Sequence, residues 1–277
     1  MRRSFEKPGR RGRAFTLVEL LIVVAVIALL IGVLGPALGS AASAARETKC
    51  SSNLRQLGVA WAAYAVDYDG KAAPLAYTDM SIIGAGDGVY WFGTDGSRTG
   101  DVDYSRGILT PYLSAPAGRD SVFECPAQPW GSYAPQTRTG QPTTTYGYNG
   151  YYLCPPHTPG WGGAWGSIGH RPWQRLDAIA RPTELLVFAD ALLPVGASGR
   201  STSLLDPPLL YDGSGGWRVN EAPTTCFRHA GRAAAAHADG SVRSREPDRD
   251  AVFVERLGVG SVSASNAPHY VPDAAAW

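Results

Sequence analysis

A long apolar run without a single charge, close to the start of the chain, constrains this sequence more than any other feature. No Asp, Glu, Lys or Arg occurs between Leu20 and Ala45, and Leu20–Leu38 is almost wholly aliphatic. A helix needs about 20 apolar residues to cross the hydrocarbon core of a bilayer. The run is therefore long enough to span a membrane as one helix.

The charges on the two sides of this run differ in sign. Residues 1–14 carry six basic residues and one acidic residue, whereas the rest of the chain carries 19 basic and 23 acidic residues. A basic segment before a membrane helix favours the orientation that keeps this segment in the cytoplasm. We expect a single-pass protein with a cytoplasmic N-terminus. The formal net charge of +1 predicts no nucleic-acid partner.

An ordinary cleaved signal peptide is the alternative for this segment. Met1–Lys7 looks like a twin-arginine leader, and the small residues at 41–45 would suit a signal peptidase. However, the apolar run exceeds the roughly 7–15 residues of a usual signal peptide, and Glu19 stands at its start. These departures favour a helix that stays in the membrane.

Beyond the apolar run the helical pattern continues but becomes one-sided. Apolar residues recur at steps of three and four, at Cys50, Leu54, Leu57, Trp61, Tyr64 and Tyr68. The opposite face is expected to hold Ser52, Asn53, Arg55 and Gln56. We predict one helix from about Phe15 to Tyr68, bent or broken near Gly35-Pro36 and ended by Asp69-Gly70 and Pro74.

The remaining chain predicts short strands between turns. Expected strands are Val89–Phe92, Thr143–Tyr148, Tyr151–Leu153, Glu184–Ala189, Cys226–Arg228, Ala233–Ala238 and Ser241–Arg245, with two-residue turns at Asn149-Gly150 and Asp239-Gly240. Segments 114–138 and 155–172 are expected to be ordered loops. The predicted fold class is α+β, with one long N-terminal helix whose second half packs on an antiparallel sheet with long loops.

The segment Phe15–Val23 resembles the N-terminal signature of type IV pilins and type II secretion pseudopilins. In that family a prepilin peptidase cuts before the Phe on the cytoplasmic side and methylates the new N-terminal amine. The resemblance implies cleavage between Ala14 and Phe15 and an N-methylated Phe15. The family usually has Gly where this chain has Ala14.

The same resemblance gives roles to Glu19 and Pro36. An acidic side chain at the centre of a membrane helix costs about 2.5–3.5 kcal/mol, so a retained carboxylate needs a partner. Glu19 would meet the N-terminal amine of a neighbouring subunit, and Pro36 matches a proline that often bends or melts this helix during assembly. The implied partners are prepilin peptidase, other pilin or pseudopilin subunits and inner-membrane lipid.

This resemblance also implies how the chain is divided. Residues 1–14 form a leader, 15–38 the membrane half of the helix, 39–70 its amphipathic half, and 71–277 a periplasmic pilin-like body. A second resemblance, to a pilin-like family of largely unknown role, covers Cys50–Gly58, Arg181–Asp190 and a C-terminal signature in which His229 precedes Asp239-Gly240 by nine intervening residues. It implies a shared fold and no particular activity.

The four cysteines, Cys50, Cys125, Cys154 and Cys226, have no spacing typical of a metal site. If the body is exported, one or two disulfides are open, and the sequence does not choose among three full pairings. His229 and Asp239 are explained as turn residues, and no metal ligand is assigned. A calcium ion is left open because Asp67–Gly70 and Asp101–Asp103 look like fragments of calcium loops.

The sequence contains no catalytic motif, so we predict that the chain is not an enzyme. The first hypothesis is a structural subunit of a type IV pilus-like or type II secretion pseudopilus filament. The alternative is a monomeric protein that uses a pilin-type anchor to display a ligand- or glycan-binding body.

Overall fold

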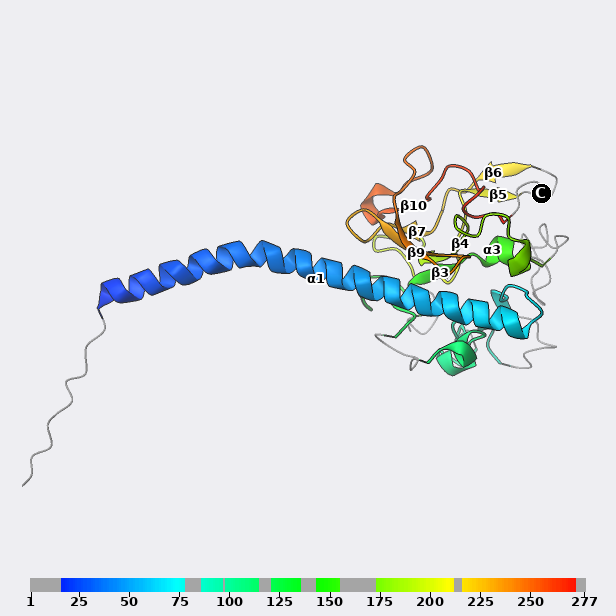
Figure 1. The fold of residues 1–277 in the computed structure, drawn as a ribbon, viewed down its shortest axis with the longest axis horizontal. Helices are drawn as coiled ribbons and strands as arrows, with labels where there is room; N and C mark the ends of the chain where they lie inside the picture. The colour runs from blue at the N-terminus through cyan, green and yellow to red at the C-terminus, as the bar shows by residue number, and fades with distance from the viewer. Residues whose placement is uncertain are drawn as a thin grey trace, which may run out of the picture. The chain divides into compact units, whose positions relative to one another are not determined.

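The computed structural model describes residues 16–77, 86–96, 98–114, 121–135, 143–154, 173–211 and 216–272. The chain divides into two compact units, Met1–Ala44 and Ala45–Trp277. The fold is α+β, as predicted: one long helix and several antiparallel sheets (Figure 1). The predicted loop at 155–172 lies outside the described residues.

The long helix α1 (Leu17–Asp67) confirms the predicted helix to within a few residues. It continues through Pro36, so of the two expected outcomes near Gly35-Pro36, a bend or a break, the break is wrong. It ends where Asp69 and Gly70 adopt left-handed φ angles of 57° and 76°. The Gly70 N–H then bonds to the carbonyl of Ala65 at 2.7 Å, a contact typical of a helix C-terminus.

The remaining elements are short, and their bounds can be followed along the colours of Figure 1. The strands are β1 (Ala76–Tyr77), β2 (Val89–Tyr90), β3 (Tyr146–Tyr148), β4 (Leu186–Asp190), β5 (Leu209–Tyr211), β6 (Trp217–Val219), β7 (Thr225–Cys226), β8 (Ala233–His237), β9 (Val242–Arg245) and β10 (Val259–Gly260). The short helices are η1 (Tyr104–Arg106), η2 (Thr110–Tyr112), α3 (Gly150–Leu153), η4 (Leu176–Ala178) and η5 (Glu255–Leu257).

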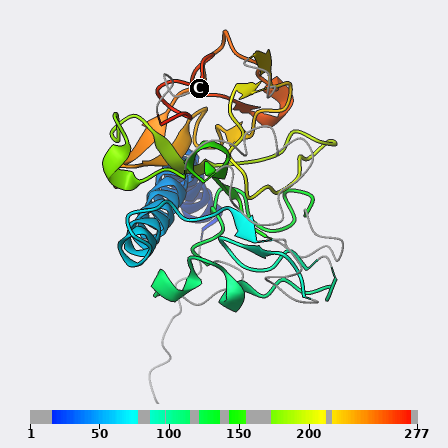
Figure 2. The same ribbon diagram turned by 90° about the vertical axis from the view of Figure 1, so that its right-hand side faces the viewer.

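The main sheet has four antiparallel strands in the order β3-β4-β8-β9. Both central strands, β4 and β8, are buried along their whole length. Alternate residues of β8 face different clusters: Ala234 and Ala236 join the core that contains α1, whereas Ala235 joins a second core with Tyr270. Figure 2 shows the sheet on one side of the buried half of α1. The sheet is thus a middle layer between α1 and the C-terminal segments.

Small residues let α1 approach this sheet closely. A Cβ added to Gly58 would lie 4.0 Å from the Cβ of Ala236. The predicted apolar face of α1 is buried from Cys50 to Tyr64, while Tyr68 is half exposed and stacks on Tyr64. Asn53 was expected on the solvent face but is buried, because its Nδ2 donates to the carbonyl of Glu124 at 3.1 Å.

The predicted hairpin at Asn149-Gly150 is wrong. Tyr146–Tyr148 is a strand, but it pairs with β4, and Gly150–Leu153 is a helical turn. Asn149 is buried, and its Nδ2 donates to the carbonyls of Leu186 and Tyr270. The side-chain amide of Asn149 thus links the end of β3 to distant segments, and the chain leaves the sheet at this residue. By contrast, the turn at Asp239-Gly240 between β8 and β9 is confirmed, with Gly240 at φ 82°.

Candidate functional site

The start of α1 is closed by a reciprocal pair of hydrogen bonds. The backbone N–H of Thr16 donates to Oε2 of Glu19 at 2.9 Å, and the N–H of Glu19 donates to Oγ1 of Thr16 at 3.2 Å. This is a capping box, which satisfies N–H groups that the first turn of a helix leaves unpaired. Glu19 therefore has a local role that the sequence analysis did not foresee. The predicted processing residues Ala14 and Phe15 lie outside the described residues.

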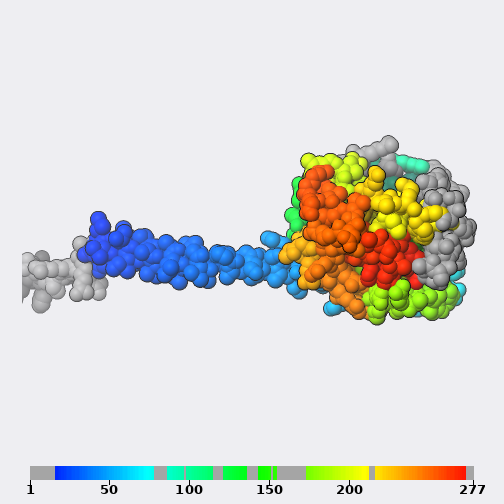
Figure 3. Space-filling model, turned by 90° about the horizontal axis from the view of Figure 1, so that it is seen from above, coloured from blue at the N-terminus to red at the C-terminus, as the bar shows by residue number. Residues whose placement is uncertain are grey.

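The side chains in the first half of α1 are exposed. Every residue from Thr16 to Arg46 is exposed, with Leu17 at 80% and Leu38 at 74%. This stretch is drawn in blue in Figure 3. The helix is long and apolar enough to cross a membrane. Such a surface needs lipid or other apolar helices around it, because exposed aliphatic side chains are unfavourable in water.

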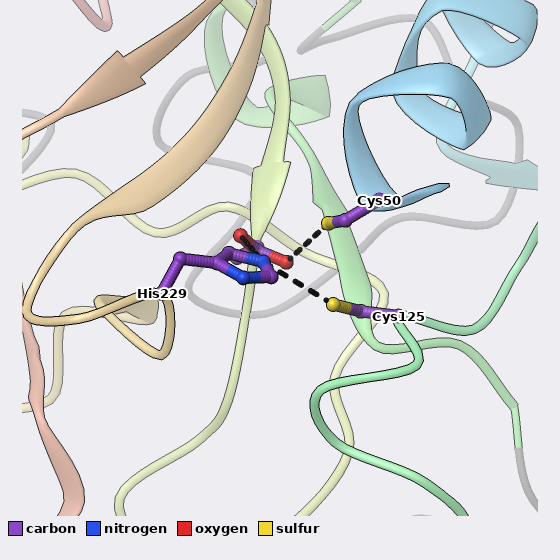
Figure 4. Close-up of side chains that lie close together, drawn as sticks. Cys50, Cys125 and His229 are labelled. Atoms are coloured by element: carbon purple, nitrogen blue, oxygen red, sulfur yellow. Dashed lines mark hydrogen bonds and ion pairs between the residues drawn. The ribbon is translucent and has the colours of Figure 1, made fainter. Parts of the chain in front are cut away.

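Four buried side chains from distant parts of the sequence meet inside the body. They are Cys50, Cys125, Asp190 and His229, and their potential ligand atoms all lie within 4.8 Å of one another. The Cys50 thiol donates to Oδ1 of Asp190 at 3.2 Å. Nε2 of His229 lies 3.3 Å from the Sγ of Cys125 and 3.3 Å from Oδ2 of Asp190. Figure 4 shows Cys50, Cys125 and His229 pointing toward one another.

Each member of this thiol cluster is held by a different element. Cys50 begins the buried stretch of α1, and Asp190 is the last residue of β4. His229 is the first residue of a tight turn, and it forms two backbone hydrogen bonds with Arg232. The two central residues of the turn, Ala230 and Gly231, have positive φ angles. The backbone N–H of Cys125 donates to Oγ1 of Thr145 at 2.7 Å.

A second set of polar groups surrounds the thiol cluster. The Tyr146 hydroxyl donates to Sγ of Cys50 at 3.3 Å, and the Ala234 N–H donates to Oδ2 of Asp190 at 2.8 Å. Nη1 of the buried Arg228 lies 3.7 Å from Oδ1 of Asp190. Its Nη2 donates to the carbonyl of Ala191. The cluster thus holds a buried carboxylate with a buried guanidinium beside it.

These neighbours shift the protonation of the cluster. Burial opposes ionisation of Asp190, but the Arg228 guanidinium, the His229 ring and the Ala234 N–H together lower the pKa of this carboxyl. Burial disfavours the charged form of His229, yet its contacts with Asp190 and Cys125 raise the pKa of the imidazole to about 10. Burial raises the pKa of the Cys50 thiol. The arrangement favours a carboxylate next to a protonated imidazole.

All four cysteines lie in the described part of the chain, and none of them forms a disulfide there. Cys50 and Cys125 meet in the thiol cluster, whereas Cys154 donates to the carbonyl of Gly150 and Cys226 lies 4.0 Å from Oε1 of Gln128. Geometry therefore brings together one of the pairs that the sequence left open.

The structure separates the residues of the C-terminal signature. His229 lies at a turn, as expected, but its ring also contacts Cys125 and Asp190 in the thiol cluster. Asp239 accepts from the N–H and hydroxyl of Ser241 in the β8–β9 turn, as expected of a turn residue, and Gly240 follows it. His237 lies beside this turn, with Nδ1 3.3 Å from the carbonyl of Ser241.

The acidic residues that resemble fragments of calcium loops form hydrogen bonds and ion pairs with other residues of the protein. Oδ2 of Asp69 lies 3.2 Å from Nη1 of Arg175, and Oδ1 of Asp103 accepts from the backbone N–H of Ser105. Asp67 accepts from the hydroxyl of Tyr112 at 2.9 Å.

The thiol cluster could not be predicted from the spacing of residues in the sequence, which suggested no metal ligand. Cys50 and Asp190 stand 140 positions apart, and Cys125 and His229 stand 104 positions apart. Local spacing rules do not reach such distances. The only earlier signal was indirect: Cys50, Asp190 and His229 each fall in a segment of the second resemblance.

Comparison with known proteins supports the N-terminal assignment. Residues 9–35 match the family described as the prokaryotic N-terminal methylation motif. The chain matches no curated protein and no solved structure. The match indicates a pilin-like chain that prepilin peptidase processes, and together with the apolar helix it supports anchoring in the inner membrane.

Proposed function

We propose that this chain is a structural subunit of a type IV pilus-like or type II secretion pseudopilus filament. Before assembly it is held in the inner membrane by α1, with the leader in the cytoplasm and the body in the periplasm. The observation that carries the proposal is the continuous helix α1, whose first half is exposed and apolar while its second half is part of a folded core.

The apolar half of α1 suits two environments in turn. Before assembly, the lipid bilayer surrounds it. After assembly, the equivalent helices of other subunits surround it in the filament core. Membrane helices associate through van der Waals packing and hydrogen bonds, because lipid tails are as apolar as their side chains. A head-to-tail contact that does not close into a ring generates a helical filament.

Glu19 is the residue proposed to set the register of this assembly. It is the one acidic residue of the described helix before Glu47. In the subunit its carboxylate accepts from the backbone and hydroxyl of Thr16. A carboxylate has about four acceptor sites, so it can also receive the N-terminal amine of a neighbour after cleavage. The capping box would then hold Glu19 in place for that contact.

Crosslinking of the full chain in its host membrane tests the proposal. We expect crosslinked homopolymers or heteropolymers in the wild type and at least a tenfold loss in Glu19→Ala. Thr16→Val is the matched control, because it removes the hydroxyl of the capping box and keeps the carboxylate. An equal loss in both variants would assign Glu19 to helix capping and not to assembly.

Processing is tested separately by mass spectrometry of the mature N-terminus. The proposal requires an N-methylated Phe15. A mature chain beginning after residue 41 would show that an ordinary signal peptidase removes the apolar run. Undiminished function of a body lacking residues 1–45 would favour the alternative, an anchored binding protein that forms no filament.

A further inference from the structure

We propose that Cys50, Cys125, Asp190 and His229 bind one zinc ion in a closed, structural site inside the body. The four side chains come from α1, the segment before β3, the end of β4 and the turn before β8. All four residues are almost fully buried, with exposed fractions between 0% and 3%. All four residues belong to the compact unit Ala45–Trp277, and the proposal does not depend on whether the chain forms a filament.

The spacing of the ligand atoms fits a small tetrahedral ion. Zinc binds sulfur at about 2.3 Å and nitrogen or oxygen at about 2.0–2.2 Å, so tetrahedral ligands stand roughly 3.4–3.8 Å apart. The closest contacts in the cluster are 3.2 Å between Cys50 and Asp190 and 3.3 Å from His229 to both Cys125 and Asp190. The Cys50 contact is to Oδ1 of Asp190 and the His229 contact is to Oδ2, and the potential ligand atoms of the four residues lie within 4.8 Å of one another. To seat the ion, the short pairs would move apart by a few tenths of an ångström and any wider pair would move together by at most about 1 Å.

The donor set selects zinc by its chemistry. Thiolate and imidazole ligands suit zinc, whereas calcium and magnesium prefer sites made of oxygen alone. Four protein ligands without an open position are typical of structural rather than catalytic zinc. Two thiolates and one carboxylate carry three negative charges. The zinc ion and the Arg228 guanidinium, 3.7 Å from Asp190, balance these charges, so the loaded site is neutral in the protein interior.

The surrounding groups hold the ligands in the way that metal sites require. Tyr146 donates a hydrogen bond to the sulfur of Cys50, and Ala234 donates its N–H to the carboxylate of Asp190. Asn53 in turn donates to the hydroxyl of Tyr146 at 3.3 Å. Such outer contacts orient the ligands and typically change metal affinity by 10–100-fold when removed.

A disulfide between Cys50 and Cys125 is the competing occupant of this place, since the body is proposed to lie in an oxidising compartment. It would use both sulfurs and leave Asp190 and His229 without a ligand role. The two occupants exclude each other because a disulfide sulfur is not a thiolate ligand.

Metal analysis of the full chain, purified in detergent without chelators, tests the site. We expect about one zinc per chain in the wild type and less than a tenth of that in Cys125→Ala and His229→Ala. Cys154→Ser, at a buried cysteine outside the cluster, should keep the wild-type content. Tyr146→Phe should keep all four ligands but lower zinc affinity by about tenfold, measured by competition with a chelator.

The wild-type protein gives a second measurement that does not depend on how variants fold. Replacement of zinc by cobalt should produce thiolate-to-cobalt charge-transfer absorption and the d–d bands of a tetrahedral site. Peptide mapping without reduction should find Cys50 and Cys125 unlinked. A Cys50–Cys125 disulfide in zinc-free wild-type protein, or zinc content unchanged in both ligand variants, would overturn the proposal.

Discussion

Nε2 of His229 lies 3.3 Å from Oδ2 of Asp190, which joins the turn before β8 to the end of β4. This contact explains the spacing of the C-terminal signature. His229 lies at one end of β8 in the buried cluster, and Asp239-Gly240 forms the turn at its other end. The nine residues between them hold β8 and its short connections, so the interval is set by the length of this strand.

Removal of the Asp190 charge should destabilise the body strongly. Asp190→Asn would leave the buried Arg228 without its carboxylate and would replace an acceptor of the Ala234 N–H. Breaking one partner of a buried ion pair costs about 3–5 kcal/mol. We expect this loss in denaturant unfolding of the full chain in detergent, followed by tryptophan fluorescence. Asp177→Asn, in an exposed pair with Arg175, is the control and should leave the unfolding midpoint unchanged.

His237 should make the body less stable in mild acid. Burial and the nearby Arg245 and Arg243 lower the pKa of His237 to about 4, although the Ser241 carbonyl and Asp239 oppose this shift. In the unfolded chain this histidine is protonated below about pH 6.5, whereas in the folded chain it is protonated only below about pH 4. The free energy of unfolding therefore falls as the pH drops through this window. The loss between pH 7.5 and pH 5 should be about 2 kcal/mol.

The matched variant for this prediction is His237→Gln, which removes the titrating ring. Unfolding free energies of both proteins are measured at the two pH values. The difference between wild type and variant should shrink or reverse toward pH 5. A constant difference would mean that His237 does not titrate in this range.

The backbone of Ala230 is strained, and a substitution at this position should relieve the strain. Ala230 is exposed and has φ 51°, a left-handed conformation that costs an L-residue about 1–2 kcal/mol. Ala230→Gly should therefore raise the free energy of unfolding by about 1 kcal/mol. Ala197→Gly, at another exposed alanine without positive φ, should lower it or leave it unchanged. Stabilisation by both variants would argue against relief of strain at Ala230.

The two faces of the second half of α1 should respond differently to truncation. Leu57 is fully buried in the main core, whereas Val59 is 64% exposed on the same helix. Leu57→Ala should cost about 2–5 kcal/mol because it opens a cavity. Val59→Ala should stay within about 0.5 kcal/mol of the wild type. Equal effects in thermal unfolding would contradict the packing of α1 on the sheet.

Local periodicity in the sequence was sufficient to predict the elements that depend on near neighbours. The uncharged run defined the apolar half of α1, and steps of three and four from Cys50 to Tyr64 defined its buried face. Strands β4, β8 and β9 were also predictable, because apolar runs and the Asp239-Gly240 turn bound them. In each case the information lies within a few residues of the element that it specifies.

Contacts between distant segments decided the rest. Asn149-Gly150 has the composition of a hairpin turn, but the hydrogen bonds of Asn149 to Leu186 and Tyr270 turn the chain out of the sheet. Asn53 has a polar side chain, yet the carbonyl of Glu124 makes its burial favourable. The meeting of Cys50 with Asp190, and of Cys125 with His229, likewise brings together α1, the segment before β3, the end of β4 and the turn before β8. Residue spacing alone carries no record of such packing, because tertiary contacts join positions that are more than a hundred residues apart.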